Sequence, residues 1–264
     1  MFHRPLAVFV GIFLAAPLGA QTTHAVGLSG TAFLPANLTV QVGDTVQWTW
    51  NSGFHDVTSG SNGVANNIFS SGVPTLPPSV FSVTFDQAFL DANPVPQNRY
   101  EYFCSVHQGI GMEGSVTVEC AAELLPYGGS TNPVGSLQST GLPTLGGTFT
   151  LLIDNPVGSQ PTGSFAFLGI SNAPDPNFPA GTLLPGFGMQ GAFGELLISV
   201  APPNPIQLLS AGPWLGVPVP VNITIPNDAA LMCRHFFAQG VMFNGSGFGA
   251  RFGLTRAVEV VLGN

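Results

Sequence analysis

The chain has 264 residues, of which 45% are hydrophobic and only 7% are charged, with a formal net charge of −8. It contains no lysine, and because an acidic, lysine-free surface cannot neutralise phosphates, we expect no nucleic-acid partner. The apolar content is too high for a disordered chain, and the 34 glycines and 24 prolines favour short strands joined by many turns.

The first twenty residues, MFHRPLAVFVGIFLAAPLGA, combine one arginine, an apolar stretch and small residues that end at Ala20. This pattern is typical of a secretory signal peptide, and we place the cleavage after Ala20. The alternative is a retained membrane anchor, although the apolar run is short for a spanning helix. We therefore expect an exported protein, periplasmic or extracellular, without a membrane span after signal removal and in an oxidising compartment.

The rest of the sequence divides into two regions, residues 21–119 and residues 120–264. The join near CAAELLPYGGSTNPVGSLQ is rich in Pro, Gly, Ser and Asn and shows no alternation from Tyr127 to Leu137. Such a composition indicates a linker or a long loop.

In the first region, LTVQVGDTVQWTWN (38–51) alternates between apolar and polar residues. It predicts two strands joined by a tight turn at Gly43 and Asp44. The following segment, 57–78, is rich in Ser, Gly, Asn and Pro, and we expect a long surface excursion. Further strands are predicted at 79–85, 100–104 and 114–119.

The second region has the same all-β texture, and its strands and turns are spaced as in a β-sandwich. One short helical turn is expected within 226–232. Strands are predicted at 147–154, 164–171, 194–201, 219–226, 233–243 and 257–262.

One loop of the first region, YEYFCSVHQGIGMEG (100–114), collects Cys104, His107 and Met112. Taken singly, such residues are more often buried hydrophobes or gap fillers. Glycines between them allow a short loop to turn back, so that several side chains can aim at one point. Thiolate, imidazole and thioether with one more imidazole suit copper in a trigonal His₂Cys arrangement with a long axial Met.

A second histidine is therefore needed, and His24, His55 and His235 are the candidates after signal removal. His55 lies in WNSGFHDVTSG, just after the strand that ends at Trp50 and in the same region as the cysteine loop. Strand pairing would bring that end of the sheet beside the loop. The predicted metal ligands are His55, Cys104, His107 and Met112.

Residues 24–119 resemble a plastocyanin-type cupredoxin, a type 1 blue copper electron carrier. The resemblance is carried by FLPANLTVQVGDTVQW (33–48), SGFHDV (52–57) and YEYFCSVHQGIGMEGSVTV (100–118). It implies a Greek-key β-sandwich with one copper near one end, the same four ligands, and an apolar docking patch around the outer edge of His107. A redox protein is the implied partner, and the acidic surface would attract a basic one.

Three residues depart from the plant-type pattern. Val106 stands where proline is frequent, and Phe103 stands where a tyrosine serves a remote electron route in plant-type members. Asp56 follows the first histidine, where asparagine is common. We expect it to tie the two ligand loops together by accepting backbone hydrogen bonds.

The remaining cysteines, Cys120 and Cys233, leave three alternatives. In an exported protein they can form a disulfide that ties the regions together, or they can be two separate buried thiols. A third alternative is a second metal site built from Cys233, His235 and Met232.

The second region is similar to a C-terminal β-sandwich module of secreted bacterial proteins, in GGTFTLLIDNP, LPGFGMQG, ITIPNDAAL and AVEVVLGN. Its role stays open between sorting, surface attachment and partner docking to a cell-envelope or protein partner. Trp214 serves either core packing or a binding surface.

The predicted fold is thus all-β, a cupredoxin β-sandwich followed by a second β-sandwich. The leading function is single-electron transfer by an exported type 1 copper protein. The alternative is a secreted binding or attachment protein on a cupredoxin scaffold, or a copper reservoir. No enzyme is expected, because the sequence lacks paired H-x-H clusters, H-E-x-x-H, G-x-S-x-G and P-loop motifs.

Overall fold

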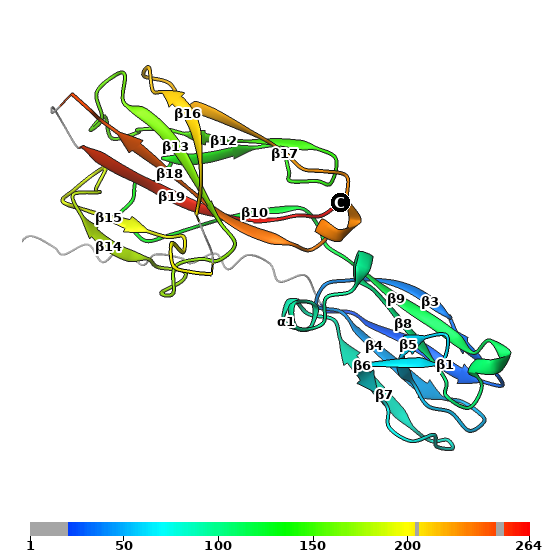
Figure 1. The fold of residues 1–264 in the computed structure, drawn as a ribbon. Helices are drawn as coiled ribbons and strands as arrows, with labels where there is room; N and C mark the ends of the chain where they lie inside the picture. Colours follow the sequence, from blue (N-terminus) through cyan, green and yellow to red (C-terminus); the bar gives the residue numbers. More distant parts are fainter. Residues whose placement is uncertain (1–20, 204–205, 247–250) are drawn as a thin grey trace, which may run out of the picture. The chain divides into compact units, whose positions relative to one another are not determined.

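The structure is a computed structural model that describes residues 21–203, 206–246 and 251–264. The expected signal peptide, residues 1–20, lies outside the described residues. The described chain is nearly all β, as predicted, and forms two compact units (Figure 1). The first unit holds the described residues up to Ala36 with Gly43–Phe89 and Tyr102–Gly114, and the second holds Asn37–Val42, Leu90–Glu101 and Ser115–Asn264.

Two sheets are built from residues 21–119. One has the order β2-β1-β4-β7, in which β1 is parallel to β4, and the other has the order β3-β9-β8-β5-β6, in which β3 is parallel to β9. The bounds of the first sheet are β1 (Thr23–Ser29), β2 (Ala32–Leu34), β4 (Thr45–Trp50) and β7 (Val80–Thr84). Those of the second are β3 (Asn37–Gln41), β5 (Thr58–Ser61), β6 (Val64–Ser70), β8 (Arg99–Phe103) and β9 (Glu113–Glu119).

Aromatic rings fill the space between these sheets. Trp48 of β4 is fully buried, and its ring centroid lies 5.2 Å from that of Tyr102 and 5.7 Å from that of Phe69. Because β4 belongs to one sheet and the other two rings to the second, the sheets pack face to face as a β-sandwich. The apolar alternation read in 38–51 therefore marks true core positions.

The two strands expected in 38–51 are present, but the expected hairpin is wrong. β3 pairs with β9 and β4 pairs with β1, so the strands belong to opposite sheets. The change of sheet occurs between two residues, because Val42 N–H donates to Glu119 O and Gly43 N–H donates to Phe85 O. Gly43 has a φ of 94°, which only glycine adopts freely.

The long excursion expected over 57–78 is also partly wrong, because β5 and β6 lie within it. Sequence patterning misses these strands because polar side chains take part in their pairing. The buried hydroxyl of Ser59 accepts hydrogen bonds from the backbone N–H groups of Ile68 and Phe69, both at 2.9 Å. The strands predicted at 79–85, 100–104 and 114–119 are confirmed as β7, β8 and β9.

Residues beyond Cys120 form three further sheets, with the orders β10-β19-β18-β13-β16, β11-β12-β17 and β14-β15 (Figure 1). Buried residues of the first two share one core, including Phe149, Leu168, Val221, Met242 and Val260. The bounds are β10 (Glu123–Tyr127), β11 (Leu137–Thr140), β12 (Thr148–Ile153), β13 (Phe165–Ser171), β14 (Thr182–Pro185), β15 (Phe193–Leu196), β16 (Gln207–Pro213), β17 (Val219–Thr224), β18 (His235–Phe243) and β19 (Phe252–Val261). Trp214 packs partly buried against this core, as the packing alternative predicts.

Two expectations for this region need correction. For the join, the long loop is confirmed between β10 and β11, but a free linker is wrong. β10 pairs with β19, and the loop is held by Asn132, whose Nδ2 donates to Glu195 O and Thr255 O at 2.7 Å each. The strand predicted at 194–201 ends at Leu196, after which Ile198 forms only an isolated bridge with Pro174. The expected helical turn is present at Ala229–Leu231.

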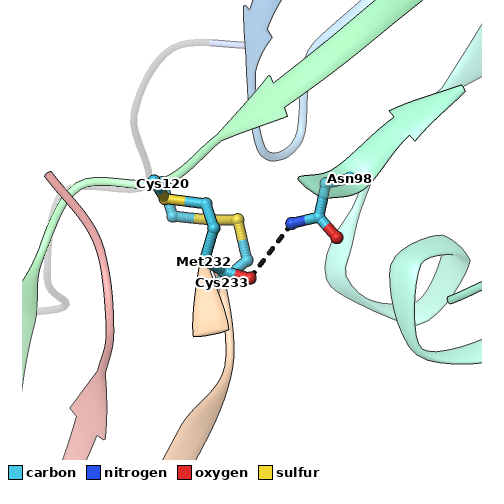
Figure 2. Close-up of a disulfide and its surroundings, with 4 residues drawn as sticks. All are labelled: Asn98, Cys120, Met232 and Cys233. Carbon is cyan, nitrogen blue, oxygen red and sulfur yellow. Dashed lines mark hydrogen bonds between the residues drawn. A yellow bond between two sulfur atoms is a disulfide. The ribbon is translucent and has the colours of Figure 1, made fainter. Parts of the chain in front are cut away.

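Cys120 and Cys233 form a disulfide with a Cα–Cα distance of 5.3 Å (Figure 2). Beside it, Asn98 Nδ2 donates a 3.0 Å hydrogen bond to the carbonyl oxygen of Met232. The predicted disulfide is therefore confirmed, and the alternatives of two separate thiols and of a second metal site are wrong. His235, proposed for that site, instead bonds Glu259.

In the described part of the chain, no helix has the length and apolarity needed to cross a membrane. The longest helical segment there, α1 (Gln87–Ala92), has six residues.

Candidate metal centre

His55 is fixed by its main chain in the loop that follows β4. Its N–H donates to Thr75 O at 3.0 Å, and its carbonyl oxygen accepts from Thr75 N–H at 2.8 Å. The same carbonyl oxygen accepts a 2.8 Å bond from the indole Nε1–H of Trp50. Three hydrogen bonds thus hold one residue, and its side chain is fully buried.

The His55 ring is oriented by a second set of contacts. Nε2 lies 2.8 Å from the carbonyl oxygen of Ser52, and because a carbonyl only accepts, Nε2 carries the proton. Nδ1 then keeps its lone pair for a metal, as in metal sites where the other ring nitrogen binds a carbonyl. The close approach requires Gly53, whose φ is 89° and where a Cβ atom would lie 2.5 Å from Nε2.

The cysteine loop turns back on itself, as its glycines predict. Cys104 follows β8, and its N–H donates to Met112 O at 3.0 Å, which joins the two ends of the loop. His107 O accepts from Met112 N–H at 3.2 Å, and a short 3₁₀ turn over Gln108–Ile110 lies between them. Gly111 ends this turn with a φ of 85°.

Three donor atoms converge in the first unit. Cys104 Sγ lies 3.7 Å from His55 Nδ1 and 3.5 Å from His107 Nδ1, and all three atoms are within 4.8 Å of one another. Metal–nitrogen and metal–sulfur bonds of about 2.0–2.3 Å, the lengths found in protein zinc sites, put nitrogen and sulfur about 3.8 Å apart when the angle between the bonds is trigonal, about 120°. The donor set and its spacing therefore fit a metal ion bound by two imidazoles and a thiolate.

Met112, the fourth predicted ligand, lies at the end of the same loop, and its side chain is fully buried. Its main chain bonds both Cys104 and His107, as described above. These bonds fix the main chain of Met112 beside Cys104 and His107. The role of its side chain as a ligand stays a prediction.

Burial shifts the pKa values of the two buried titratable donors, Cys104 and His55, in opposite directions. It is the largest cause that raises the pKa of the Cys104 thiol, opposed by the backbone N–H groups of Asp56, Val106 and His107. Burial likewise is the largest cause that lowers the pKa of His55. His55 is therefore ready to bind as a neutral imidazole, whereas the thiol must release its proton when a metal binds.

Asp56 links the two loops, as expected from its position after His55. It is buried, with 3% of its surface exposed. Its Oδ1 accepts from the backbone N–H of Ser105 at 2.7 Å, and its Oδ2 accepts from the hydroxyl of Thr58 at 2.9 Å. Asp56, which follows His55, thus holds Ser105, which follows Cys104.

Three large apolar side chains are exposed near the site. Phe54, Val106 and Ile110 are exposed, at 48%, 48% and 67%, and each lies next to a predicted ligand or on the loop between ligands. His107 is partly exposed on the same loop, whereas Phe103 is buried. The chain thus leaves apolar side chains on the loops that carry the donor atoms.

Several supporting residues were not found from the sequence. Ser52, Thr75 and Trp50 act through backbone carbonyls or an indole N–H, and such contacts have no sequence motif. Gly53, two residues before a candidate ligand, carries the one available signal, because a glycine beside a functional residue often permits a close approach.

Residues 21–119 are similar in sequence to copper proteins. The family described as copper binding proteins of the plastocyanin/azurin family matches residues 21–119. A plastocyanin of Scenedesmus fuscus is 34% identical over 95 residues, which are 33% of this chain and 86% of that protein. A plastocyanin of Synechococcus sp. (strain JA-2-3B'a(2-13)) is 34% identical over 115 residues, 40% of this chain and 79% of that protein. Among solved structures, a purple cupredoxin from Nitrosopumilus maritimus is 28% identical, covers 36% of this chain and 97% of its own, and has a TM-score of 0.28.

Proposed function

Because the chain belongs to the plastocyanin/azurin family of copper-binding proteins, we propose that it is an exported type 1 copper protein that carries single electrons between redox partners. The observation that carries this proposal is the triangle of His55 Nδ1, Cys104 Sγ and His107 Nδ1. In this proposal His55, Cys104 and His107 would be the main ligands of the copper, and Met112 would be a weaker fourth one.

Each residue has a separate task. Cys104 supplies the thiolate and His55 a neutral imidazole whose orientation is set by Ser52. His107, the partly exposed ligand, gives the site its contact with the outside. Bound copper would supply a one-electron couple with a strong thiolate bond.

Rigidity of the ligand loops supports electron transfer rather than slow ligand exchange. The donors are held by contacts within the protein, namely three hydrogen bonds on the main chain of His55 and the link from Asp56 to Ser105. A site that need not rearrange lowers the cost of changing the oxidation state.

The partner is proposed to be a redox protein that docks on the apolar surface around His107. Phe54, Val106 and Ile110 would form the contact, and the net charge of −8 favours a basic partner at low salt. The same proposal has three further parts. They are export through residues 1–20, a division between residues 119 and 120, and docking of the second sandwich to a cell-envelope or protein partner.

The test is a titration of the protein, expressed without residues 1–20, with Cu(II). One equivalent should give an intense blue thiolate-to-copper absorption that ascorbate bleaches and an oxidant restores. Cys104→Ser should abolish the colour and Cys233→Ser should keep it, whereas Met112→Leu should keep it and change the reduction potential. A colourless copper adduct without a reversible redox wave would support a copper reservoir or an attachment scaffold instead.

A further inference from the structure

We propose that the carboxylate of Asp56 is a tuning group that lowers the reduction potential of copper held by His55, Cys104 and His107. This inference rests on the proposed function, because it requires copper at that site. It goes beyond the linking role of Asp56, because an amide at the same position would make the link without the charge.

The placement of Asp56 is the first observation. It follows His55 in sequence and accepts a 2.7 Å hydrogen bond from the N–H of Ser105, the residue after Cys104. Only 3% of its surface is exposed. Its charge therefore lies between two ligand-bearing loops, where water screens it little.

The second observation is the chemistry of its partners. Both carboxylate oxygens accept hydrogen bonds, Oδ1 from Ser105 N–H and Oδ2 from Thr58 Oγ1–H at 2.9 Å. An ionised carboxylate only accepts, so this pattern suits the charged group. The ion pairs found in the described part of the chain join His24 to Asp44, Arg99 to Glu101 and His235 to Glu259, and none includes Asp56.

The direction of the effect follows from charge. Cu(II) carries one more positive charge than Cu(I), so a nearby anion stabilises the oxidised state and lowers the potential. A nearby charge shifts the pKa of a group by about one to three units, and a copper couple responds to the same electrostatic potential. We expect removal of the charge to favour Cu(I) by at least about tenfold, which is about 59 mV for one electron.

Asp56→Asn is the central variant, because it removes the charge and keeps the shape. The amide oxygen still accepts from Ser105 N–H, and the Thr58 hydroxyl can turn to accept from the new amide. Thr58→Val is the complementary variant. It removes a donor that partly neutralises the carboxylate, so at pH 8 it should shift the potential in the opposite direction.

Glu113→Gln is the matched control. Glu113 adjoins Met112 in sequence as Asp56 adjoins His55, but its side chain is exposed. Water and salt screen an exposed carboxylate, so its removal should change the copper equilibrium less than twofold.

The potential of the copper-loaded proteins is measured at pH 8 against a mediator of known potential. Asp56→Asn above the wild type, with Thr58→Val below it and Glu113→Gln unchanged, supports the proposal. Asp56→Asn at or below the wild-type potential overturns it. If Asp56→Asn does not retain copper, a Thr58→Val potential at or above the wild type overturns it as well.

A second readout needs no metal. In the copper-free protein, hydrogen exchange of the Ser105 amide should stay slow in Asp56→Asn and become fast in Asp56→Ala, which separates the link from the charge. Equal protection in both variants overturns the assignment of this hydrogen bond. A wild type that is blue and reversible but insensitive to Asp56→Asn would sink this inference alone, whereas a wild type without a blue copper site would sink the proposed function.

Discussion

Nε2 of His55 donates a 2.8 Å hydrogen bond to the carbonyl oxygen of Ser52, and Nδ1 of the same ring lies 3.7 Å from Cys104 Sγ. One ring nitrogen is thus held by the protein so that the other faces the thiol. Ligand histidines in metal sites are oriented in this way by a partner on the second nitrogen. The Ser52–His55 segment is therefore part of the site as much as the ligands are.

Replacing Gly53 with alanine tests this orientation. A Cβ atom there would lie 2.5 Å from His55 Nε2, so the ring must move away from Ser52. We expect Gly53→Ala to weaken copper affinity about 10–100-fold, the usual effect of losing an outer hydrogen-bond partner of a metal ligand. Competition with a chelator of known copper affinity measures the change.

Gly72→Ala is the control for backbone strain. Gly72 has a φ of 88°, close to the 89° of Gly53, but no atom lies within 4 Å of its added Cβ. Both variants place an alanine at a positive φ, which strains the backbone, but only Gly53→Ala displaces the His55 ring. Equal copper affinities in the two variants would refute the role given to the ring contact.

The disulfide should stabilise the second unit without affecting copper. Cys120 and Cys233 are separated by 113 residues in sequence, and closing a long loop restricts the unfolded chain. We expect the double variant Cys120→Ser/Cys233→Ser to lose about 2–5 kcal/mol of unfolding free energy in urea and to keep its blue colour. Cys104→Ser should lose the blue colour and keep the stability that the disulfide provides. A colourless double variant would contradict this separation of roles.

A buried amide should make the loop after β10 sensitive to mutation. Asn132 is 1% exposed, and its Oδ1 accepts the Glu195 N–H at 2.9 Å. Gln239 also donates to the carbonyls that Asn132 binds, so Asn132→Ala leaves mainly that N–H unpaired, at a cost of about 1–3 kcal/mol. Asn222→Ala, which removes an exposed bond to Thr150, should change the unfolding free energy by no more than about 0.5 kcal/mol. Equal losses would contradict the buried role.

Protonation of His235 should contribute to stability at acidic pH. Its pKa is raised above 6.5, chiefly by the hydrogen bond to Glu259, while burial opposes the rise. A pKa raised by folding stabilises the protein fully below pH 6.5, and this contribution is lost as the pH rises through the folded-state pKa. NMR titration should give a His235 pKa above 6.5 that falls in Glu259→Gln. In urea, His235→Gln should cost more stability at pH 5.5 than at pH 8.5, and the opposite order would contradict the sign.

The ligand loop was readable from sequence because its chemistry is local. Cys104, His107 and Met112 lie within nine residues with glycines between them, and the structure joins the ends of this loop through main-chain hydrogen bonds. The convergence of His55 was predicted from its place after a strand and is confirmed by its 3.7 Å distance from Cys104 Sγ. Carbonyl contacts such as those of Ser52 and Thr75 have no side-chain signature.

Strand partners were less predictable than strands. The alternation in 38–51 marks buried faces correctly, but a sandwich and a hairpin share that pattern. Residues distant in sequence decide between the two arrangements, because Glu119 and Phe85 accept hydrogen bonds from Val42 and Gly43. β5 and β6 lack the apolar alternation that predicts a strand, because a buried polar group, the Ser59 hydroxyl, takes part in holding them together.

X-ray absorption at the copper edge of the loaded protein identifies the atoms bound to the metal. We expect two imidazole nitrogens and one short thiolate sulfur in both oxidation states, with little change in bond lengths on reduction, and loss of one nitrogen in His55→Ala. A copper without a short sulfur bond, or an unchanged spectrum in His55→Ala, would contradict the assignment of His55, Cys104 and His107 as its ligands.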